Sequence, residues 1–441
     1  MSKTPIFDFL NKYASLDTAR FHMPGHKGVE TLGVERYDIT EIDGADSLYE
    51  ADGIIAESEK NLSDIFGTRA SFYSTEGSSL CIRAMVYLAQ FYRKSDKQKI
   101  LAARNVHKSF VSALALCGVE ADFLSSSDLY SCKVDKDELE NMLKADNYFA
   151  FYVTSPDYLG CMQNIPEISE VCHKYNVPLI VDNAHGAYLK FVGLHPVDLG
   201  ADMCCDSAHK TLFCLTGSAY LHISKNALFD YQKYAKTALS LFASTSPSYL
   251  LMASMDLANR RMMSEGFCNM LKKTAQRVQE IKNLATQKSI ECFGQEPIKL
   301  TLKPKSYGYY ANEISRMMIQ HNIYPEFCDK DNLVLMFSVN NTQEDFDKII
   351  SFIKELPQKE KINDTPPEIP SRLTRKMSVR QALFSLSEIV DVELCKNRIL
   401  ADASVSCPPA IPIAISGEVL DENAIKCFEY YGIEKIKVLK Q

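Results

Sequence analysis

Short apolar runs alternate with helical segments between residues 70 and 224, and this alternation constrains the fold more than any other feature of the sequence. Strand-like runs such as YFAFYVTS at 148–155 and VPLIVD at 177–182 are apolar along most of their length, which is typical of strands that are buried on both faces. Helical segments lie between these runs. The pattern predicts an α/β fold in which helices cover both faces of an open, mostly parallel sheet.

The remaining runs fit the same arrangement. Further strands are expected at ASFYST (70–75), KILAA (99–103), DMCCDS (202–207) and SAYLHIS (218–224). Helices are expected over residues 53–67, with Gly67 ending the first, from 77 to 92, from about 107, and over 166–175. Ligands of such sheets bind beyond the carboxyl ends of the strands, so polar clusters at those ends are candidate functional residues.

The whole chain is expected to have five parts. Residues 1–55 carry turn signals such as MPGHKG and are expected to be an irregular N-terminal arm. The large domain covers 56–248, and a long helical segment after Ser246 then leads into a small α/β domain, together 249–358. The charged, proline-rich stretch 359–372 is interpreted as a linker to a C-terminal domain at 373–441.

Composition excludes several classes of protein. The 441 residues carry a net charge of −7 and no lysine- or arginine-rich tract, so nucleic acid and anionic membranes are not expected partners. No apolar run reaches membrane-span length, and MSKTPIFDFLNKYASL holds no signal-peptide core. The 14 cysteines form no CxxC pair and are interpreted as buried thiols of a cytoplasmic protein. No metal site is predicted, because the MPG between His22 and His26 prevents a shared helical face.

The first polar cluster is STEGSS at 74–79, between an expected strand and an expected helix. Gly77 permits a tight turn, and Ser78 and Ser79 open the helix. The free N–H groups and the positive end of a helix dipole suit a phosphate group at this position. The simpler alternative is that these serines only cap the helix.

Two further clusters hold histidines. His107 in NVHKS begins a helix, where it either has a structural role or places its flat ring on an aromatic cofactor. Asp182 in VDNAHG ends a buried strand, so its charge needs a partner. It either caps the following turn or pairs with a protonated ring nitrogen, in which case His185 would lie beside the same ring.

The last cluster is DSAHKTL, where Ser207 and Lys210 follow a strand-like run. Lys210 either extends its ammonium to solvent or is a desolvated amine suited to a Schiff base with a carbonyl. Taken together, the phosphate turn, the histidine, the strand-end aspartate and the Ser-x-x-Lys are the parts needed to hold pyridoxal 5′-phosphate. Its ring acts as an electron sink when an acidic partner keeps its nitrogen protonated.

With these clusters in place, the chain resembles the bacterial ornithine/lysine/arginine decarboxylases, which are pyridoxal phosphate enzymes of fold type I. The matching segments are FHMPGHKG (21–28), TEGSS, RNVHKS, VDNAHG, DSAHKTL, STSPSYLLMAS (244–254) and CPPAIPIAISGE (407–418). The resemblance implies α-decarboxylation of lysine, arginine or ornithine to a diamine or agmatine and carbon dioxide, as in polyamine biosynthesis.

The resemblance also implies a role for each matching residue. Lys210 would form the Schiff base with the cofactor, and His209 would lie near the substrate carbon as a proton donor. His107 would stack on the ring, Asp182 would pair with its nitrogen, and Glu418 would lie near the distal cation of the substrate. The residues expected to contact the cofactor are Gly77, Ser78, Ser79, His107, Asp182, His185, Ser207, Lys210, Thr245 and Ser246, the last two from the neighbouring subunit of a homodimer.

Three departures from the family pattern are visible. Gly217 stands where the family often has glutamine, and Ser416 precedes Gly417-Glu418 where Pro-Gly-Glu is usual. FHMPGHKG begins at residue 21, so a short form without the N-terminal wing domain is expected, assembled as a dimer or a small set of dimers. Two other functions stay open: an aminotransferase or carbon–carbon lyase on the same fold, and a non-catalytic binding homologue.

Overall fold

The computed structural model describes residues 3–93, 98–126, 130–368, 373–406 and 411–440. Its largest sheet has seven strands in the order β1-β7-β6-β5-β4-β2-β3. β5 pairs parallel with β6 and β2 with β3, whereas β7 runs antiparallel to both β1 and β6. The predicted α/β fold with a mostly parallel sheet is therefore confirmed. The strands are β1 (Ala70–Ser74), β2 (Lys99–Ala102), β3 (Glu120–Phe123), β4 (Tyr148–Thr154), β5 (Leu179–Asp182), β6 (Met203–Asp206) and β7 (Ala219–Ile223).

The chain divides into two compact units. The first comprises Met1–Lys97, Asn147–Tyr152 and Ile165–Cys268, and the second comprises Gln98–Asp146, Val153–Asn164 and Asn269–Gln441. The domain boundaries expected from the sequence stay predictions.

Helices of the first unit follow the sequence signals closely. α2 (Ile54–Phe66) begins where the Asp46 carboxylate accepts the N–H groups of Gly53 and Ile55, each at 2.9 Å, and it ends at Gly67 in the left-handed region at φ +62°. The other helical elements of this unit are α3 (Gly77–Phe91), α6 (Ile165–Lys174), η3 (Ala187–Val192), α7 (Ala208–Thr211), α8 (Gln232–Ser240) and α9 (Tyr249–Met262).

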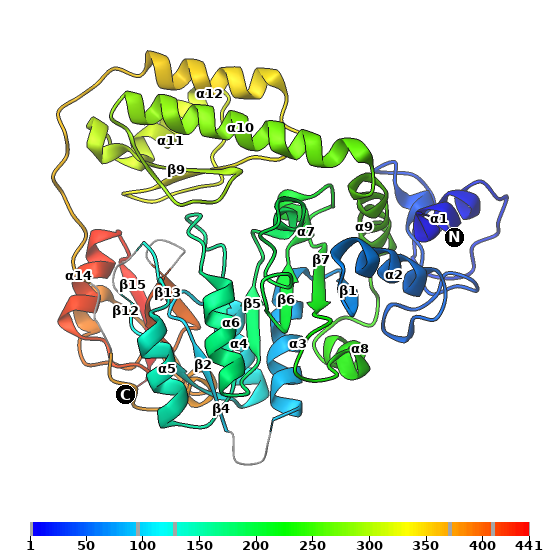
Figure 1. Ribbon diagram of the computed structural model, residues 1–441, viewed down its shortest axis with the longest axis horizontal. Coiled ribbons are helices and arrows are strands. Elements are labelled where there is room, and N and C mark those ends of the chain that lie inside the picture. The colour runs from blue at the N-terminus through cyan, green and yellow to red at the C-terminus, as the bar shows by residue number, and fades with distance from the viewer. Residues whose placement is uncertain (1–2, 94–97, 127–129, 369–372, 407–410, 441) are drawn as a thin grey trace. The chain divides into compact units, whose positions relative to one another are not determined.

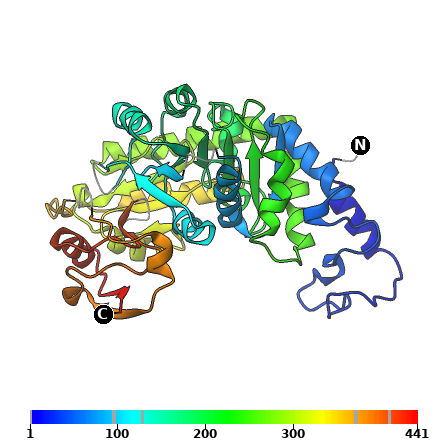
Figure 2. The same cartoon turned by 90° about the horizontal axis from the view of Figure 1, so that it is seen from below.

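The expectation that residues 1–55 are irregular is wrong at their start, where α1 (Pro5–Ala14) forms a helix. Pro5 occupies the first turn, and Ile6 and Leu10 are buried. The carboxylate of Asp256 on α9 accepts the N–H groups of Ile6 at 2.9 Å and Phe7 at 3.0 Å, so a distant residue satisfies the helix end. After α1, the segment up to α2 has only the short turns η1 (Glu35–Tyr37) and η2 (Leu48–Glu50) and forms a long loop (Figures 1 and 2).

The single long helical segment expected after Ser246 is two helices, α9 and α10 (Glu265–Gln287). The break falls at Met263 and Ser264. The Ser264 hydroxyl donates to the Arg261 carbonyl at 2.7 Å, and such a local bond competes with continuation of the helix.

The second unit contains a four-stranded sheet in the order β10-β11-β9-β8, with α10, α11 and α12 beside it (Figure 1). Its elements are α4 (Lys108–Cys117), α5 (Lys136–Ala145), β8 (Glu291–Phe293), β9 (Lys299–Lys303), η4 (Pro304–Tyr307), α11 (Ala311–Gln320), β10 (Phe327–Cys328), β11 (Leu333–Met336) and α12 (Gln343–Glu355).

The C-terminal part of this unit is built on two small antiparallel sheets, β12 with β15 and β13 with β14. Leu400, Ile413 and Phe428 are fully buried in its own hydrophobic core. Residues 359–368 of the expected linker hold no helix or strand, while 369–372 and the first four residues of CPPAIPIAISGE lie outside the described residues. The elements are α13 (Val379–Leu383), β12 (Ser387–Asp391), η5 (Val392–Leu394), β13 (Ser404–Ser406), β14 (Pro412–Ile415), α14 (Glu422–Tyr430) and β15 (Lys435–Leu439).

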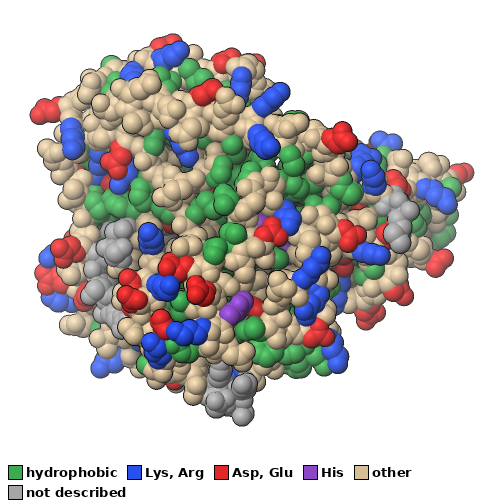
Figure 3. Space-filling view, viewed as in Figure 1, with side chains coloured by type: hydrophobic (Ala, Val, Ile, Leu, Met, Phe, Trp, Pro, Cys, Tyr) green, Lys and Arg blue, Asp and Glu red, His purple; other side chains and the backbone are tan. Residues whose placement is uncertain are grey.

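Within the described ranges, every helix is too short or too polar to serve as a membrane span. On the face shown in Figure 3, basic and acidic side chains are interspersed, and neither sign forms a continuous patch.

Candidate active site

The turn between β1 and α3 holds the first predicted site residues. Gly77 lies in the left-handed region at φ +71°, and its N–H donates to the carbonyl of Gly217 at 2.7 Å. Ser78 and Ser79 occupy the first turn of α3, whose positive end suits an anion. The hydroxyl of Ser207 donates to that of Ser78 at 2.8 Å, so two of the predicted phosphate ligands meet in the folded chain.

Gly217 itself is constrained at this turn. It lies at φ +101°, and a Cβ atom there would be 3.2 Å from the Leu251 side chain and 3.4 Å from the Thr75 carbonyl oxygen. Because side chains rarely adopt this backbone conformation, the glutamine often found in the family would strain the contact with Gly77. Glycine at this position is thus explained by the turn that it supports.

Lys210 belongs to α7, the short helix that follows β6. Its N–H donates to the carbonyl of Ser207 at 3.1 Å, so one helical turn joins the two residues. The side-chain Nζ lies 2.9 Å from Nε2 of His185, which is 4% exposed. The half-buried amine is therefore directed at His185, which comes from the loop after β5.

Asp182 ends β5 and is 2% exposed. Its Oδ2 accepts the hydroxyl of Tyr152 at 3.1 Å, and its Oδ1 accepts the N–H of Ala184 at 3.1 Å and the Cys205 thiol at 3.6 Å. These bonds fix the carboxylate without a cation among them. Tyr152 was missed by sequence reasoning, since a tyrosine inside an apolar strand looks like an ordinary core residue.

One ring nitrogen of His209 forms a hydrogen bond with the backbone. Its Nδ1 lies 2.9 Å from the carbonyl oxygen of Ser218, which can only accept, so Nδ1 carries a proton. The backbone N–H of His209 also donates to this carbonyl at 3.3 Å. The ring is thereby fixed to Ser218, the residue directly before β7.

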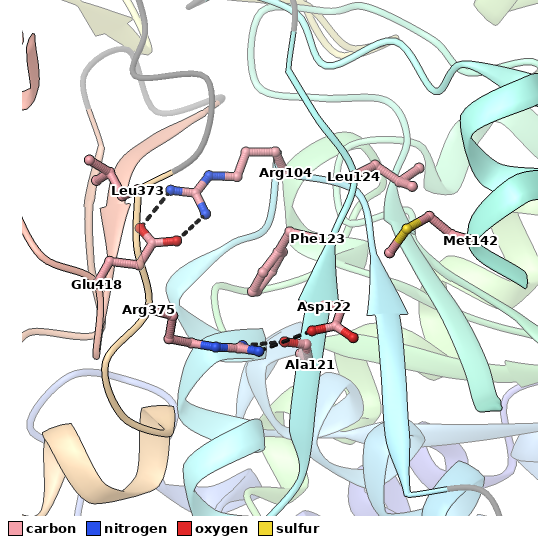
Figure 4. A pocket seen from close by; sticks show the side chains of 9 residues that line it. All are labelled: Arg104, Ala121, Asp122, Phe123, Leu124, Met142, Leu373, Arg375 and Glu418. Atoms are coloured by element: carbon pink, nitrogen blue, oxygen red, sulfur yellow. Dashed lines mark hydrogen bonds and ion pairs between the residues drawn. The ribbon is translucent and has the colours of Figure 1, made fainter. Parts of the chain in front are cut away.

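His107 and Glu418 belong to the second unit. His107 is exposed and caps α4, because its Nδ1 accepts the N–H of Ser109 at 3.2 Å. Glu418 lies in a cavity where its two carboxylate oxygens accept hydrogen bonds from Arg104, at 2.7 and 2.8 Å (Figure 4). Its Oε2 also accepts the N–H of Ile415 at 2.8 Å. Arg104 was not among the predicted site residues, although it begins the motif RNVHKS.

A second ion pair lines the same cavity, in which Arg375 contacts Asp122 at 3.0 Å and points away from Glu418 in Figure 4. Both arginines therefore have acidic partners. The apolar part of the lining consists of Ala121, Phe123, Leu124, Met142 and Leu373.

Thr245 and Ser246 are exposed. In the part of the chain that the structure describes, neither hydroxyl forms a hydrogen bond with Ser78 or Ser207, although the neighbouring Ser244 N–H donates to Glu76 at 2.5 Å. Their expected contribution from a second subunit stays a prediction.

The residues of the first unit fit pyridoxal phosphate. Serine hydroxyls at a helix N-terminus suit a phosphate, a buried carboxylate suits a protonated ring nitrogen, and an amine suits an aldehyde. The serines, the amine and the buried carboxylate are connected through neighbouring residues. Ser78 contacts Ser207, which lies one helical turn before Lys210. Lys210 in turn contacts His185, which is close to Asp182 in the sequence.

Comparisons with known proteins agree with this arrangement. The family model described as "Orn/Lys/Arg decarboxylase, major domain" matches residues 4–306. The arginine decarboxylase of Bacillus subtilis strain 168 is 28% identical over 465 residues, covering 96% of this chain and 92% of the relative. That of Bacillus anthracis is 27% identical over 463 residues, with the same coverage of 96% and 92%.

Solved structures show the same fold. The constitutive lysine decarboxylase of E. coli superposes with a TM-score of 0.77 at 16% identity, covering 99% of this chain and 82% of that one. Lysine decarboxylase A from Pseudomonas aeruginosa gives 0.78 at 16% identity, covering 99% and 80%. An alanine–glyoxylate aminotransferase from Nostoc gives 0.55 at 15% identity, covering 68% and 85%.

Proposed function

The chain belongs to the Orn/Lys/Arg decarboxylase family of pyridoxal phosphate-dependent enzymes, and we propose that it removes the α-carboxylate of a basic amino acid as carbon dioxide. The observation that carries the proposal is the Lys210 amine, 2.9 Å from His185 and one turn from the Ser207–Ser78 contact. The products would be carbon dioxide and a diamine, or agmatine from arginine.

Each residue of the site would have a defined task. Gly77, Ser78, Ser79 and Ser207 would bind the phosphate, Asp182 would accept the N–H of the ring nitrogen, and Lys210 would supply the amine that binds the aldehyde. His185 would lie beside the ring, and His107 would stack on it. When bound, pyridoxal phosphate withdraws the electron pair that the departing carboxylate leaves at the α-carbon.

A proton must then reach the α-carbon, from Lys210 or from His209. Because Nδ1 of His209 already donates to the Ser218 carbonyl, His209 can supply a proton from Nε2 only when the ring is doubly protonated. A neutral His209 leaves Lys210 as the donor.

Among the three basic amino acids, we propose arginine first. The similar Bacillus proteins named arginine decarboxylases support this choice, since the similarity spans 96% of the chain. Glu418 would lie near the distal cation, with its carboxylate oriented by Arg104. We also propose a cytoplasmic homodimer in which Thr245 and Ser246 complete the neighbouring site.

Purified protein loaded with pyridoxal phosphate tests the activity when it is supplied with arginine, lysine or ornithine. Release of carbon dioxide together with agmatine, cadaverine or putrescine supports the proposal, whereas formation of a keto acid would favour an aminotransferase. Lys210→Ala should lose both the activity and the visible absorbance band of the lysine-bound cofactor. Lys190→Ala is the matched control, because Lys190 pairs with Asp198 at 2.7 Å instead of lying at the site.

Mixing two inactive variants tests the shared site. Lys210→Ala and the double variant Thr245→Val/Ser246→Ala should each be inactive alone. If the subunits share their sites, each mixed dimer regains one of its two sites, so an equimolar mixture with random pairing regains about a quarter of the wild-type activity. No recovery in mixed dimers would contradict a site completed by the partner.

A further inference from the structure

Asp206 is a buried carboxylate that the proposed chemistry does not use. It ends β6, directly before Ser207, and is 0% exposed. Its Oδ2 accepts from Nε2 of His195 at 3.1 Å and from Nε2 of His222 at 3.2 Å, and both imidazole side chains are also 0% exposed. A carboxylate with no exposure to water needs such donors to be stable. The site chemistry does not explain why this charge is buried here.

The other carboxylate oxygen ties β6 to the loop after β5. Oδ1 of Asp206 accepts from Nδ2 of Asn183 at 2.6 Å, and the backbone N–H of Asn183 donates to the Cys205 carbonyl at 3.0 Å. The loop is packed closely around this side chain, because a Cβ atom at Gly186 would lie 2.0 Å from Oδ1 of Asn183. His185 is part of that loop.

These contacts join two short segments of the chain at both of their ends. From Asp206 the chain leads through Ser207 to Lys210, and from Asn183 it leads to His185. The two branches are joined at one end by the Asp206–Asn183 bond of 2.6 Å and at the other by the Lys210–His185 contact of 2.9 Å. The side chain of Asp206 therefore bridges the two branches at the end away from Lys210 and His185.

The two histidines connect these two segments to the rest of the sheet. His222 lies on β7, where it pairs with Cys204 of β6, and its Nδ1 lies 2.7 Å from the Ser71 hydroxyl of β1. Its ring stacks on Phe66, with the centroids 4.3 Å apart. Burial raises the pKa of Asp206, but attraction to His195 and His222 and their hydrogen bonds outweigh it and hold that pKa well below its ordinary range. Asp206 therefore stays charged and keeps its donors.

We propose that Asp206, held by His195 and His222, is a positioning residue that fixes Lys210 against His185 by anchoring Asn183. The inference deepens the proposed function, since it takes Lys210 as the lysine that binds the cofactor. A hydrogen-bonded carboxylate also accounts for the cluster without a metal ion: Asp206 has three hydrogen-bond donors, and Nδ1 of His195 has no partner among the described residues. A metal-binding histidine normally has its second nitrogen held, as Nδ1 of His222 is held by Ser71, whereas Nδ1 of His195 is not.

The test compares Asp206→Asn with Asp202→Asn, which alters the residue directly before the start of the same strand. Asp202 is 1% exposed and accepts from His173 at 2.8 Å and from the N–H of Leu179 at 2.8 Å, so its loss affects stability far from Lys210 along β6. Both variants are loaded with pyridoxal phosphate. Visible circular dichroism of the bound cofactor, divided by its absorbance, reports how rigidly the protein orients it, and kcat and KM are measured in parallel.

In Asp206→Asn, we expect the dichroism per bound cofactor to fall about threefold and kcat to fall about tenfold or more, with KM nearly unchanged. Asp202→Asn should lower only the unfolding temperature. Wild-type dichroism and kcat in Asp206→Asn would overturn the proposal, as would equal losses in both variants or one tightly bound metal ion per chain.

If Asp206→Asn does not fold, His195→Gln and Asn183→Ala replace it. Both should lower the dichroism ratio, and normal ratios in both would also overturn the proposal. A wild-type protein that shows the Lys210-dependent band but decarboxylates none of the three amino acids would instead refute the proposed function, and the dichroism comparison would still decide the role of Asp206.

Discussion

The guanidinium of Arg104 binds both carboxylate oxygens of Glu418, at 2.7 and 2.8 Å, and joins residues that are 314 positions apart in the sequence. Their side chains are only 12% and 7% exposed. Two parallel bonds of this kind are geometrically specific, and neither charge has ready access to water as a substitute partner. The pair therefore fixes the C-terminal segment around Glu418 to the loop that leads to His107.

Removing one member of this pair should be more damaging than removing both. Glu418→Gln leaves the Arg104 charge buried without its partner, so we expect the free energy of unfolding to fall by about 3 kcal/mol. The double variant with Arg104→Gln should lose less than the sum of the single losses, as measured by denaturant unfolding. Glu30→Gln is the control, because its pair with Arg36 is about half exposed, at 48% and 51%, and it should change stability little.

Gly217 leads to a second prediction. Gly217→Ala places a Cβ atom at φ +101° close to Leu251 and the Thr75 carbonyl, so the carbonyl that accepts from Gly77 must shift. We expect the dissociation constant for pyridoxal phosphate to rise about tenfold, measured by fluorescence titration of the unloaded protein. Gly193→Ala is the control: its φ is +75°, but nothing lies within 4 Å of the added atom. Equal weakening in both variants would show that backbone strain alone is responsible.

Features that depend on neighbouring residues were predicted well from the sequence. Gly67 was expected to end α2 and does so with left-handed geometry, and the apolar runs became strands within one or two residues of their expected ends. The strand-end position of Asp182 also follows directly from its sequence. Such signals are local because helix capping and strand burial are set by a few adjacent residues.

Features that depend on distant partners were missed. Asp206 was seen only as part of an expected strand, and nothing in its neighbourhood indicates His195 or His222, which reach it from a loop and from β7. Similarly, α1 is stabilised by Asp256, whose sequence separation from Ile6 is 250 positions. Periodicity describes which face of an element is apolar, but it does not identify the polar group that lies against it.

The hydrogen bond from Tyr152 to Asp182 predicts graded losses of activity. Asp182→Asn removes the negative charge expected to hold the ring-nitrogen proton, and we expect kcat to fall by about a hundredfold or more. Tyr152→Phe keeps the charge and removes one donor at 3.1 Å, so about a tenfold loss is expected. Steady-state kinetics on the fully loaded variants measures both. Tyr148→Phe, at the start of the same strand, is the control and should retain wild-type kcat. A larger loss of kcat in Tyr152→Phe than in Asp182→Asn would contradict the prediction.

Asp256 predicts a dependence of stability on pH. Burial raises its pKa from the ordinary 3.8 to about 6, although bonds from Ser58, Phe7 and Ile6 oppose this shift. Between pH 3.8 and 6 the unfolded chain ionises this group while the folded chain keeps it protonated, so the stability falls as the pH rises. The free energy of unfolding should thus decrease by about 3 kcal/mol across this window through Asp256 alone.

The Asp256→Asn variant isolates this contribution, because its amide oxygen can still accept from the N–H groups of Ile6 and Phe7 but does not titrate. The difference in unfolding free energy between wild type and Asp256→Asn should change across pH 4 to 6 and be constant above pH 7. Asp64→Asn, on the exposed side of α2, should follow the wild type throughout. A constant difference from pH 4 to 8 would show that Asp256 is ionised in the folded protein over the whole range, and that α1 is held by a charged carboxylate.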